Sequence, residues 1–303
     1  MKFPPITYRA SLIFLVVLVL AALMSSWTFD KYETSFMQQH KTLAAQSVRA
    51  VASELRFLLE NFSKKVNRFA KQYNESLWQL DQNPDDKETY NRVHKSLGER
   101  FPGYRAFTIA NSEGQLLDIG FGEKIGPSCL KNIQRHMIDR HTTVIAAHSE
   151  FEEYHFDIMA PWSFKDIDKN ILFTNYSLDE ITRLLEVGQA KQHSLILTNN
   201  DDPNLIEITA AGGRDAIQKT RPIRLTGSDV SRIAHSQWIE GTEWILRDIY
   251  DEQLLPDYRL RLWRPLIGAW VIVLLLIGLS LFFIRKAELS PPPVDTDQPE
   301  GSL

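Results

Sequence analysis

One segment, residues 153–162, holds side chains whose types and spacing suit the binding of a small molecule. As a β-strand it places alternate residues on opposite faces, one aromatic and aliphatic and the other carrying Asp157. A carboxylate among aromatic rings can receive an ammonium group, and an arginine can hold a carboxylate through two parallel donors. The predicted ligand-binding residues are therefore Arg105, Tyr154, Asp157 and Trp162. The alternative is that Tyr154 belongs to the core, and that Arg105 and Asp157 are edge or paired residues.

The other reactive residue types give little support for catalysis or for a metal centre. The eight histidines are scattered, and His136 and His141 do not have the i, i+4 spacing that places two ligands on one helix face. Neither a P-loop nor a Gly-x-Ser-x-Gly motif occurs. Cys129 is the only cysteine, so it cannot form a disulfide within the chain, and we interpret it as a structural thiol. The sequence predicts a protein that is not an enzyme, with no catalytic residues, no metal and no cofactor.

Two long apolar segments indicate a membrane protein. Residues 10–27 and 266–284 carry no charged side chain, and each is about long enough to cross a hydrocarbon core of ~30 Å. The first could instead be a cleaved signal peptide, but its end lacks a clean cleavage motif. We therefore predict an uncleaved first span and a two-pass protein of a bacterial inner membrane. The formal net charge of −4 argues against a nucleic-acid partner.

Basic residues beside the spans predict the orientation. Lys2 and Arg9 precede the first span, and Arg285 and Lys286 follow the second, which favours both termini in the cytoplasm. Three arginines that precede the second span oppose this assignment: Arg259, Arg261 and Arg264. Residues 1–9 and 285–303 are then cytoplasmic, the second as a disordered Pro-rich tail. Residues 28–265 form the extracytoplasmic region, which is periplasmic or extracellular.

The extracytoplasmic region begins with a predicted long helix over residues 30–80. Apolar residues recur there in steps of three and four, without Gly or Pro. They are Val48, Val51, Leu55, Leu58, Phe62, Val66, Phe69, Tyr73, Leu77 and Leu80. Such a stripe packs on its own domain, and it can also form a dimer seam.

After a short helix over residues 87–97 the pattern changes to strands. A hairpin is predicted from residues 104–110 and 115–119, followed by a helix from 127 to about 140. Further strands are predicted at 143–149, 153–162 and 170–176, and a helix at 177–187. A smaller set repeats the theme, with strands at 193–198, 205–210 and 241–249 and a helix at 228–235. This order predicts an α+β fold, in which helices cover antiparallel sheets.

Several of these segments together resemble the Cache family of PAS-like extracytoplasmic sensor domains. They are the long helix, the hairpin AFTIANSEGQLLDIG, the strand ending in Ala160-Pro161-Trp162, the passage NILFTNYSLDEITRLL and the closing GTEWIL. The resemblance implies a distal lobe over residues 84–176, a connecting helix and a smaller proximal lobe over 190–262. A double Cache with a reduced second lobe and a single Cache with an extension both remain open. It also implies a small molecule bound in the distal lobe, between the sheet and the helix and loop that cover it. The family's amino-acid-binding signature, a Tyr and Arg followed closely by Trp-Tyr, is not evident.

The resemblance and the two spans predict a membrane-anchored sensory protein that forms a homodimer. Because no kinase, cyclase or methyl-accepting module follows the second span, we expect it to signal through a separate partner, such as a cyclase or a kinase. The alternative is a periplasmic scaffold or assembly protein, for example a polysaccharide chain-length regulator with the same two-span layout.

Overall fold

The computed structural model describes residues 6–111, 115–117, 127–138, 145–150, 153–165 and 167–289. It divides into two compact units. We call Gln39–Asp251 the sheet unit, and the segments Met1–Gln38 and Glu252–Leu303 together the helical unit. Some predicted features lie outside the described residues, among them most of the predicted tail. These residues are 1–5, 112–114, 118–126, 139–144 and 290–303.

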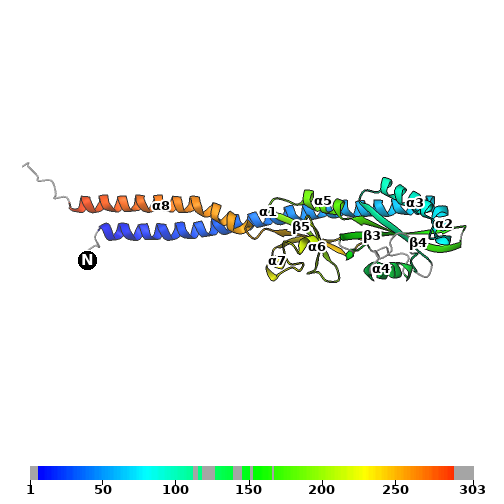
Figure 1. The fold of residues 1–303 in the computed structure, drawn as a ribbon. Helices are drawn as coiled ribbons and strands as arrows, with labels where there is room; N and C mark the ends of the chain where they lie inside the picture. The colour runs from blue at the N-terminus through cyan, green and yellow to red at the C-terminus, as the bar shows by residue number, and fades with distance from the viewer. Residues whose placement is uncertain are drawn as a thin grey trace, which may run out of the picture. The chain divides into compact units, whose positions relative to one another are not determined.

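The described elements follow one another in the order that Figure 1 labels. The helices are α1 (Ile6–Gln72), α2 (Asn74–Gln82), α3 (Lys87–Arg100), α4 (Pro127–Ile138), α5 (Asp179–Gly188), α6 (Arg214–Ile217), α7 (Gly227–Ser231) and α8 (Leu254–Leu289). The strands are β1 (Tyr104–Ala110), β2 (Ala147–Glu150), β3 (Glu153–Phe164), β4 (Ile167–Ser177), β5 (His193–Asn199), β6 (Ile206–Thr209), β7 (Gly212–Gly213), β8 (Ile233–Trp238) and β9 (Trp244–Tyr250).

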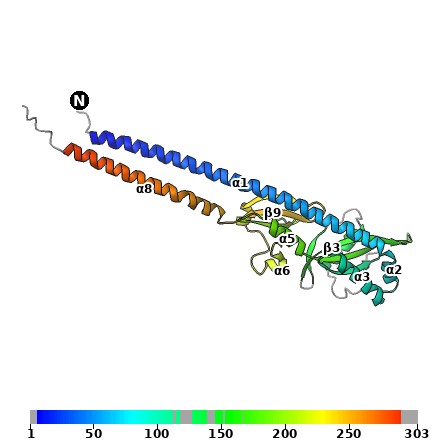
Figure 2. The same ribbon diagram turned by 90° about the horizontal axis from the view of Figure 1, so that it is seen from above.

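In the helical unit, the first part of α1 lies beside α8 (Figures 1 and 2). Both helices are long and apolar enough to cross a membrane, with mean hydropathies of 2.4 and 2.8 over their most apolar windows. The rings of Phe36 and Tyr258 stack with centroids 3.7 Å apart. Arg259 donates two hydrogen bonds to Glu33, at 2.9 and 2.7 Å, and these bonds lower the pKa of Glu33. Arg259 is one of the three arginines whose position argues against the predicted orientation, and its charge is paired with a carboxylate on the neighbouring helix.

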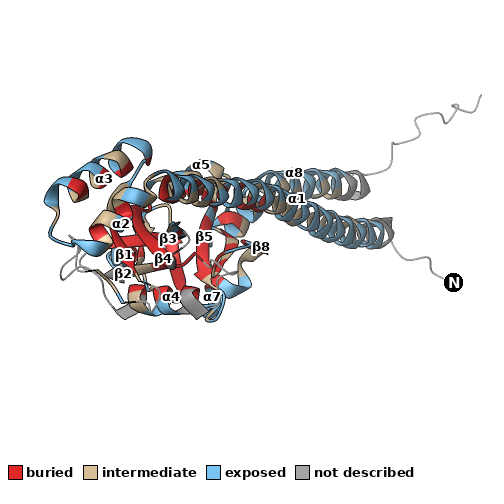
Figure 3. Cartoon of the chain, turned by 90° about the vertical axis from the view of Figure 1, so that its right-hand side faces the viewer, coloured by how far each residue is buried: buried red, intermediate tan, exposed pale blue. Residues whose placement is uncertain are grey.

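The sheet unit contains two antiparallel sheets. The strand order of the first sheet is β1-β4-β3-β2, and that of the second is β7-β6-β5-β9-β8. The part of α1 that belongs to this unit runs along both sheets (Figure 2). Its apolar stripe is buried, from Val48 through Leu55 and Phe62 to Phe69, and packs in one hydrophobic cluster with residues of both sheets. Figure 3 shows this pattern as buried strands on one side of a helix whose other face is exposed.

The predicted α+β class is confirmed, because a long helix and two antiparallel sheets make up the sheet unit. The bounds of some elements differ from those expected. The predicted long helix is interrupted at Tyr73, whose backbone (φ −103°, ψ 15°) separates α1 from α2. The predicted hairpin is present where it is described: Ala110 bridges to Leu116, and the amide of Leu117 donates to the carbonyl of Ile109.

The predicted helix at 228–235 is wrong in its second half. Helix α7 ends at Ser231, and Ile233–Trp238 forms strand β8 instead. Strand β8 pairs with β9 over its whole length, from Ile233 opposite Ile249 to Trp238 opposite Ile245. A strand that completes a sheet satisfies its backbone donors and acceptors through a partner distant in sequence, and this outweighs a local helical pattern.

Candidate functional site

Strand β3 presents two chemically different faces, as its alternating sequence predicts. Tyr154, Phe156, Ile158, Ala160 and Trp162 all belong to the hydrophobic cluster on the α1 side of the first sheet. Met159 instead belongs to a second cluster, with Cys129 and Ile133 of α4. Because neighbours along a strand face opposite ways, His155 and Asp157 lie on the side of Met159. The α4 side of this sheet therefore combines an apolar patch with ionisable side chains.

The hairpin of β2 and β3 places two histidines beside each other. His148 and His155 are directly opposite in the antiparallel register, and opposed residues share a face of the sheet. Their ring centroids lie 4.8 Å apart. Asp157 follows two residues after His155, so its carboxylate is on the same face. Nε2 of His148 lies 2.8 Å from Oδ2 of Asp157, and Nε2 of His155 lies 3.6 Å from Oδ1.

Helix α4 supplies the fourth member of this group, Cys129. The residue lies in the first turn of α4, and its Sγ is 3.1 Å from Nε2 of His148 and 3.8 Å from Nε2 of His155. The ligand-type atoms of Cys129, His148, His155 and Asp157 all lie within 4.8 Å of one another. We call these four residues the four-donor cluster. Thiolate, imidazole and carboxylate are the side-chain groups that bind transition metals in proteins.

Three residues of the four-donor cluster are buried, and the side chain of His148 is 10% exposed. Cys129 is 1% exposed, and His155 and Asp157 are each 3% exposed. Neither carboxylate oxygen of Asp157 accepts a hydrogen bond with proper angles from the described residues, although both lie near imidazole nitrogens. Its contacts with charged or chargeable groups in the described part of the chain are the two histidines and no Lys or Arg. A buried carboxylate is costly without compensating charge or hydrogen bonds, so this group needs a role.

The geometry of the cluster differs from that of a catalytic triad. In a triad, one imidazole nitrogen faces the nucleophile and the other faces the carboxylate. Here the thiol and the carboxylate both approach the same nitrogen, Nε2 of His148. Nε2 of His155 likewise faces both groups. The four donors therefore converge on one point instead of forming a relay.

The structure distributes the four predicted ligand-binding residues over different places. Asp157 belongs to the four-donor cluster. Tyr154 and Trp162 lie in the hydrophobic cluster on the opposite face of the same strand. Arg105 is half-buried, at the point where the register of β1 against β4 shifts between Tyr104 and Ala106. The structure thus does not bring these four residues into one pocket.

Sequence reasoning missed Cys129, His148 and His155. The two histidines lie on different, paired strands, and Cys129 lies on a helix, so helical spacing could not reveal them. The signal was the His-x-Asp pattern at positions 155–157, which places both side chains on one face of a strand. The predicted absence of a metal rested on a spacing rule that applies only within one helix.

Tyr154 instead takes part in a polar network between the two sheets. Its hydroxyl donates to Oε2 of Glu207 at 2.5 Å, and Arg214 donates to both oxygens of the same carboxylate, at 2.9 and 2.5 Å. Asn199 adds a hydrogen bond at 3.1 Å. Burial and the nearby carboxylate raise the pKa of Tyr154, so its hydroxyl keeps the proton that it donates.

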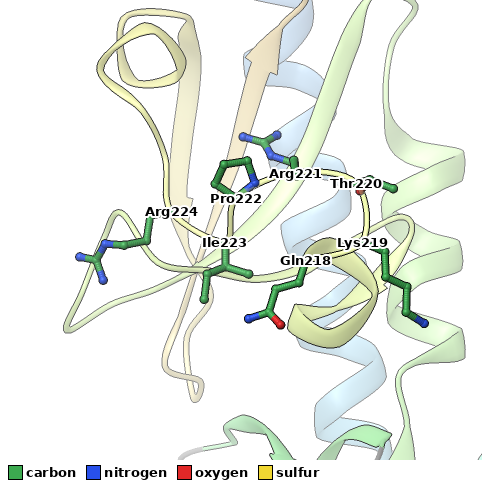
Figure 4. Close-up of a pocket in the computed structure, with 7 residues that line it drawn as sticks. All are labelled: Gln218, Lys219, Thr220, Arg221, Pro222, Ile223 and Arg224. Carbon is green, nitrogen blue, oxygen red and sulfur yellow. The ribbon is translucent and has the colours of Figure 1, made fainter.

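A hollow of about 620 Å³ in the second sheet's loops is a weaker candidate site. A single segment, residues 218–224, lines it (Figure 4). The side chains of Lys219 and Arg224 point away from each other in this view. Arg221 and Arg224 already form ion pairs with Asp229 and Asp202. The basic side chains at this hollow therefore do not converge on a ligand.

No family model and no curated protein matches this chain. Solved structures do. The ligand-binding domain of the Pseudomonas aeruginosa PAO1 amino acid chemoreceptor PctB, in complex with L-Gln, is 11% identical, with 70% of this chain and 91% of that chain covered and a TM-score of 0.46. The V. cholerae histidine kinase DctB sensor domain is 10% identical, with 72% of this chain and 98% of that chain covered and a TM-score of 0.46. The Vibrio cholerae LuxQ periplasmic domain is 14% identical, with 70% of this chain and 100% of that chain covered and a TM-score of 0.43. The backbone fold of the chain is thus similar to those of the ligand-binding, sensor and periplasmic domains named here.

Proposed function

We propose that this chain is a two-pass inner-membrane sensory protein whose sheet unit lies outside the cytoplasm and binds a small ligand. The ligand binds on the α4 side of the first sheet and shifts the sheet unit between two packings. The change passes through α1 and α8 to a separate partner protein, such as a kinase or a cyclase, and the working form is a homodimer. The Cache resemblance of the sequence supports the same reading.

One observation carries the proposal: a single helix, α1, contains a candidate membrane span and also contributes the buried stripe that both sheets share. A change in packing at the sheets therefore acts directly on a helix that enters the membrane. The buried polar group under α4 gives the first sheet a place where a ligand can change that packing.

The test is a ligand screen on the full chain in detergent micelles. The fluorescence of its seven tryptophans during heating reports the melting temperature. A ligand that binds the folded state raises the melting temperature with its concentration. We expect one chemical class of metabolite or ion to do so. If no compound of a chemically diverse library changes the melting temperature and the protein forms ring-shaped oligomers, the scaffold alternative is supported. Reporter fusions in the sheet unit that face the cytoplasm would overturn the proposed orientation.

A further inference from the structure

We propose that Cys129, His148, His155 and Asp157 bind a divalent transition metal ion of the zinc class. This inference rests on the proposed function in one respect, since it names the ligand class for the α4 side of the first sheet. The metal site itself depends only on the four side chains and their surroundings.

The first argument is the convergence of the donor atoms. Two elements of different kinds, a helix and a hairpin, bring one sulfur, two nitrogens and a carboxylate within 4.8 Å of one another. Each Nε2 carries only one proton or one lone pair, and yet it faces both the sulfur and the carboxylate. A cation at the point where the four donors converge would account for this arrangement.

The second argument is the charge of the buried group. The carboxylate of Asp157 is 2% exposed at its side chain and accepts no well-formed hydrogen bond from the described residues. Both opposed histidine rings also turn the same atom, Nε2, toward this carboxylate. A divalent ion supplies the positive charge that the carboxylate needs, which no Lys or Arg in the described part of the chain provides.

The donor types select the class of metal. Calcium and magnesium take oxygen ligands, so a set with one thiolate and two imidazoles does not suit them. Zinc accepts sulfur, nitrogen and oxygen donors in a tetrahedral arrangement. Four protein donors also fill the coordination shell and leave no position for a reactive water, which favours binding over hydrolysis. Copper and nickel compete by affinity, but they prefer square-planar or tetragonal sites.

The site has a direct mechanical consequence for the first sheet. Cys129 is on α4, and the other three donors are on β2 and β3. Apart from Cys129, the α4 side of this sheet is held by a small cluster that contains Ile133, Met159, Ile171 and Phe173. A bound ion would tie the helix to the hairpin, so the docking of α4 would depend on metal.

The experiment uses the full chain in detergent, stripped with a chelator and titrated with Co²⁺ as a spectroscopic substitute for Zn²⁺. We expect equimolar binding, the intense visible bands of four-coordinate cobalt, a thiolate-to-cobalt charge-transfer band, and displacement by Zn²⁺. Cys129→Ser should abolish the charge-transfer band, and Cys129→Ser and His155→Gln should each weaken binding by at least about a hundredfold. His235→Gln is the matched control, a histidine on β8 that should leave the titration unchanged.

The outcomes separate the metal site from the sensory function. If the wild-type chain shows no thiolate-to-cobalt band, the metal site is overturned whether or not the variants fold. Stabilisation by an organic metabolite in that case would still support the sensor. If cobalt binds as expected, hydrogen exchange in α1 and α8 with and without Zn²⁺ decides the rest. If Zn²⁺ changes the protection of amides in α1 and α8 from exchange, metal sensing is supported. If this protection stays constant, metal sensing is overturned, but the metal site itself is still supported.

Discussion

Tyr154 of the first sheet donates a hydrogen bond to Glu207 of the second sheet, at 2.5 Å from Oε2. The same carboxylate accepts from Arg214, whose guanidinium lies 5.8 Å from the centre of the Tyr154 ring. Glu207 is 1% exposed. The two sheets are therefore joined by a buried charged group as well as by the apolar cluster on α1.

Removing the Tyr154 hydroxyl should destabilise the sheet unit. Hydrogen bonds to charged groups contribute about 1.5–3 kcal/mol, and we expect Tyr154→Phe to lower the free energy of unfolding by this amount. Glu207→Ala should cost at least as much, about 3 kcal/mol, because it removes the acceptor of both Tyr154 and the partly exposed Arg214. Urea unfolding of the full chain measures both changes. Tyr90→Phe is a matched control, since that ring contributes by stacking on Phe107; an equal loss there would contradict the assignment.

Gly213 is required by the close approach of Tyr154. A Cβ at position 213 would overlap the Cβ, Cγ and Cδ1 atoms of Tyr154. We expect Gly213→Ala to destabilise the fold by about 1–3 kcal/mol, because the ring must move out of its packed position. Gly227→Ala provides the comparison, since its Cβ would meet no atom within 4 Å. Similar melting temperatures for the two variants would refute this role of Gly213.

Phe62 should be the most sensitive aromatic position tested on α1. Its ring lies 5.1 Å from that of Tyr176 and 6.1 Å from that of Phe156, and the residue is 8% exposed. Phe62→Ala leaves a cavity among these rings, and we expect a loss of about 3–5 kcal/mol. Phe57 is on the same helix but is 60% exposed, so Phe57→Ala should change stability by less than about 0.5 kcal/mol. Equal losses would show that the packing of α1 on the sheets is wrong.

His40 should make the sheet unit sensitive to acid. Its Nδ1 lies 2.8 Å from Nε2 of His193, and Nδ1 of His193 lies 2.6 Å from Oδ1 of Asp248. Burial and the neighbouring His193 lower the pKa of His40, and Asp248 opposes this effect. The unfolded chain then binds a proton more readily than the folded chain.

The stability that depends on neutral His40 is therefore fully present above its ordinary pKa of about 6.5. It is lost as pH falls from there through the lower pKa of the folded state. Melting temperatures of the full chain between pH 7.5 and pH 5 would measure this loss, in buffers chosen at roughly half-unit steps. His40→Asn should flatten the slope, whereas His235→Asn should preserve it. An unchanged slope in the His40 variant would rule out this residue as the cause.

Local patterns were sufficient to predict the long helix and the two faces of β3. The apolar residues from Val48 to Leu80 are buried, or partly buried at Leu58 and Tyr73, because a stripe with helical spacing has to cover a core. The alternation from Tyr154 to Trp162 likewise predicted which side chains share a face of β3, and the structure places one of these faces in the cluster on α1.

Contacts between distant segments could not be predicted in this way. The predicted helix at 228–235 includes the first half of β8, because the partner of this strand, β9, is not apparent from its own residues. Cys129 and His148 are 19 positions apart and meet only through the packing of α4 on a sheet. Tyr154 was expected at a ligand, and its actual neighbour, Glu207, comes from another sheet 53 positions later.

The shared hydrophobic cluster on α1 limits how this protein can evolve. Val48 and Phe69 belong to one continuous cluster with Leu197 of the second sheet and Phe107 of the first, so the two sheets share their largest core, although each also has a small cluster on its other face. An exchange of one lobe with that of a relative would have to bring along the matching stretch of helix. Domain shuffling is therefore expected to preserve the helix and both sheets as a single inherited block.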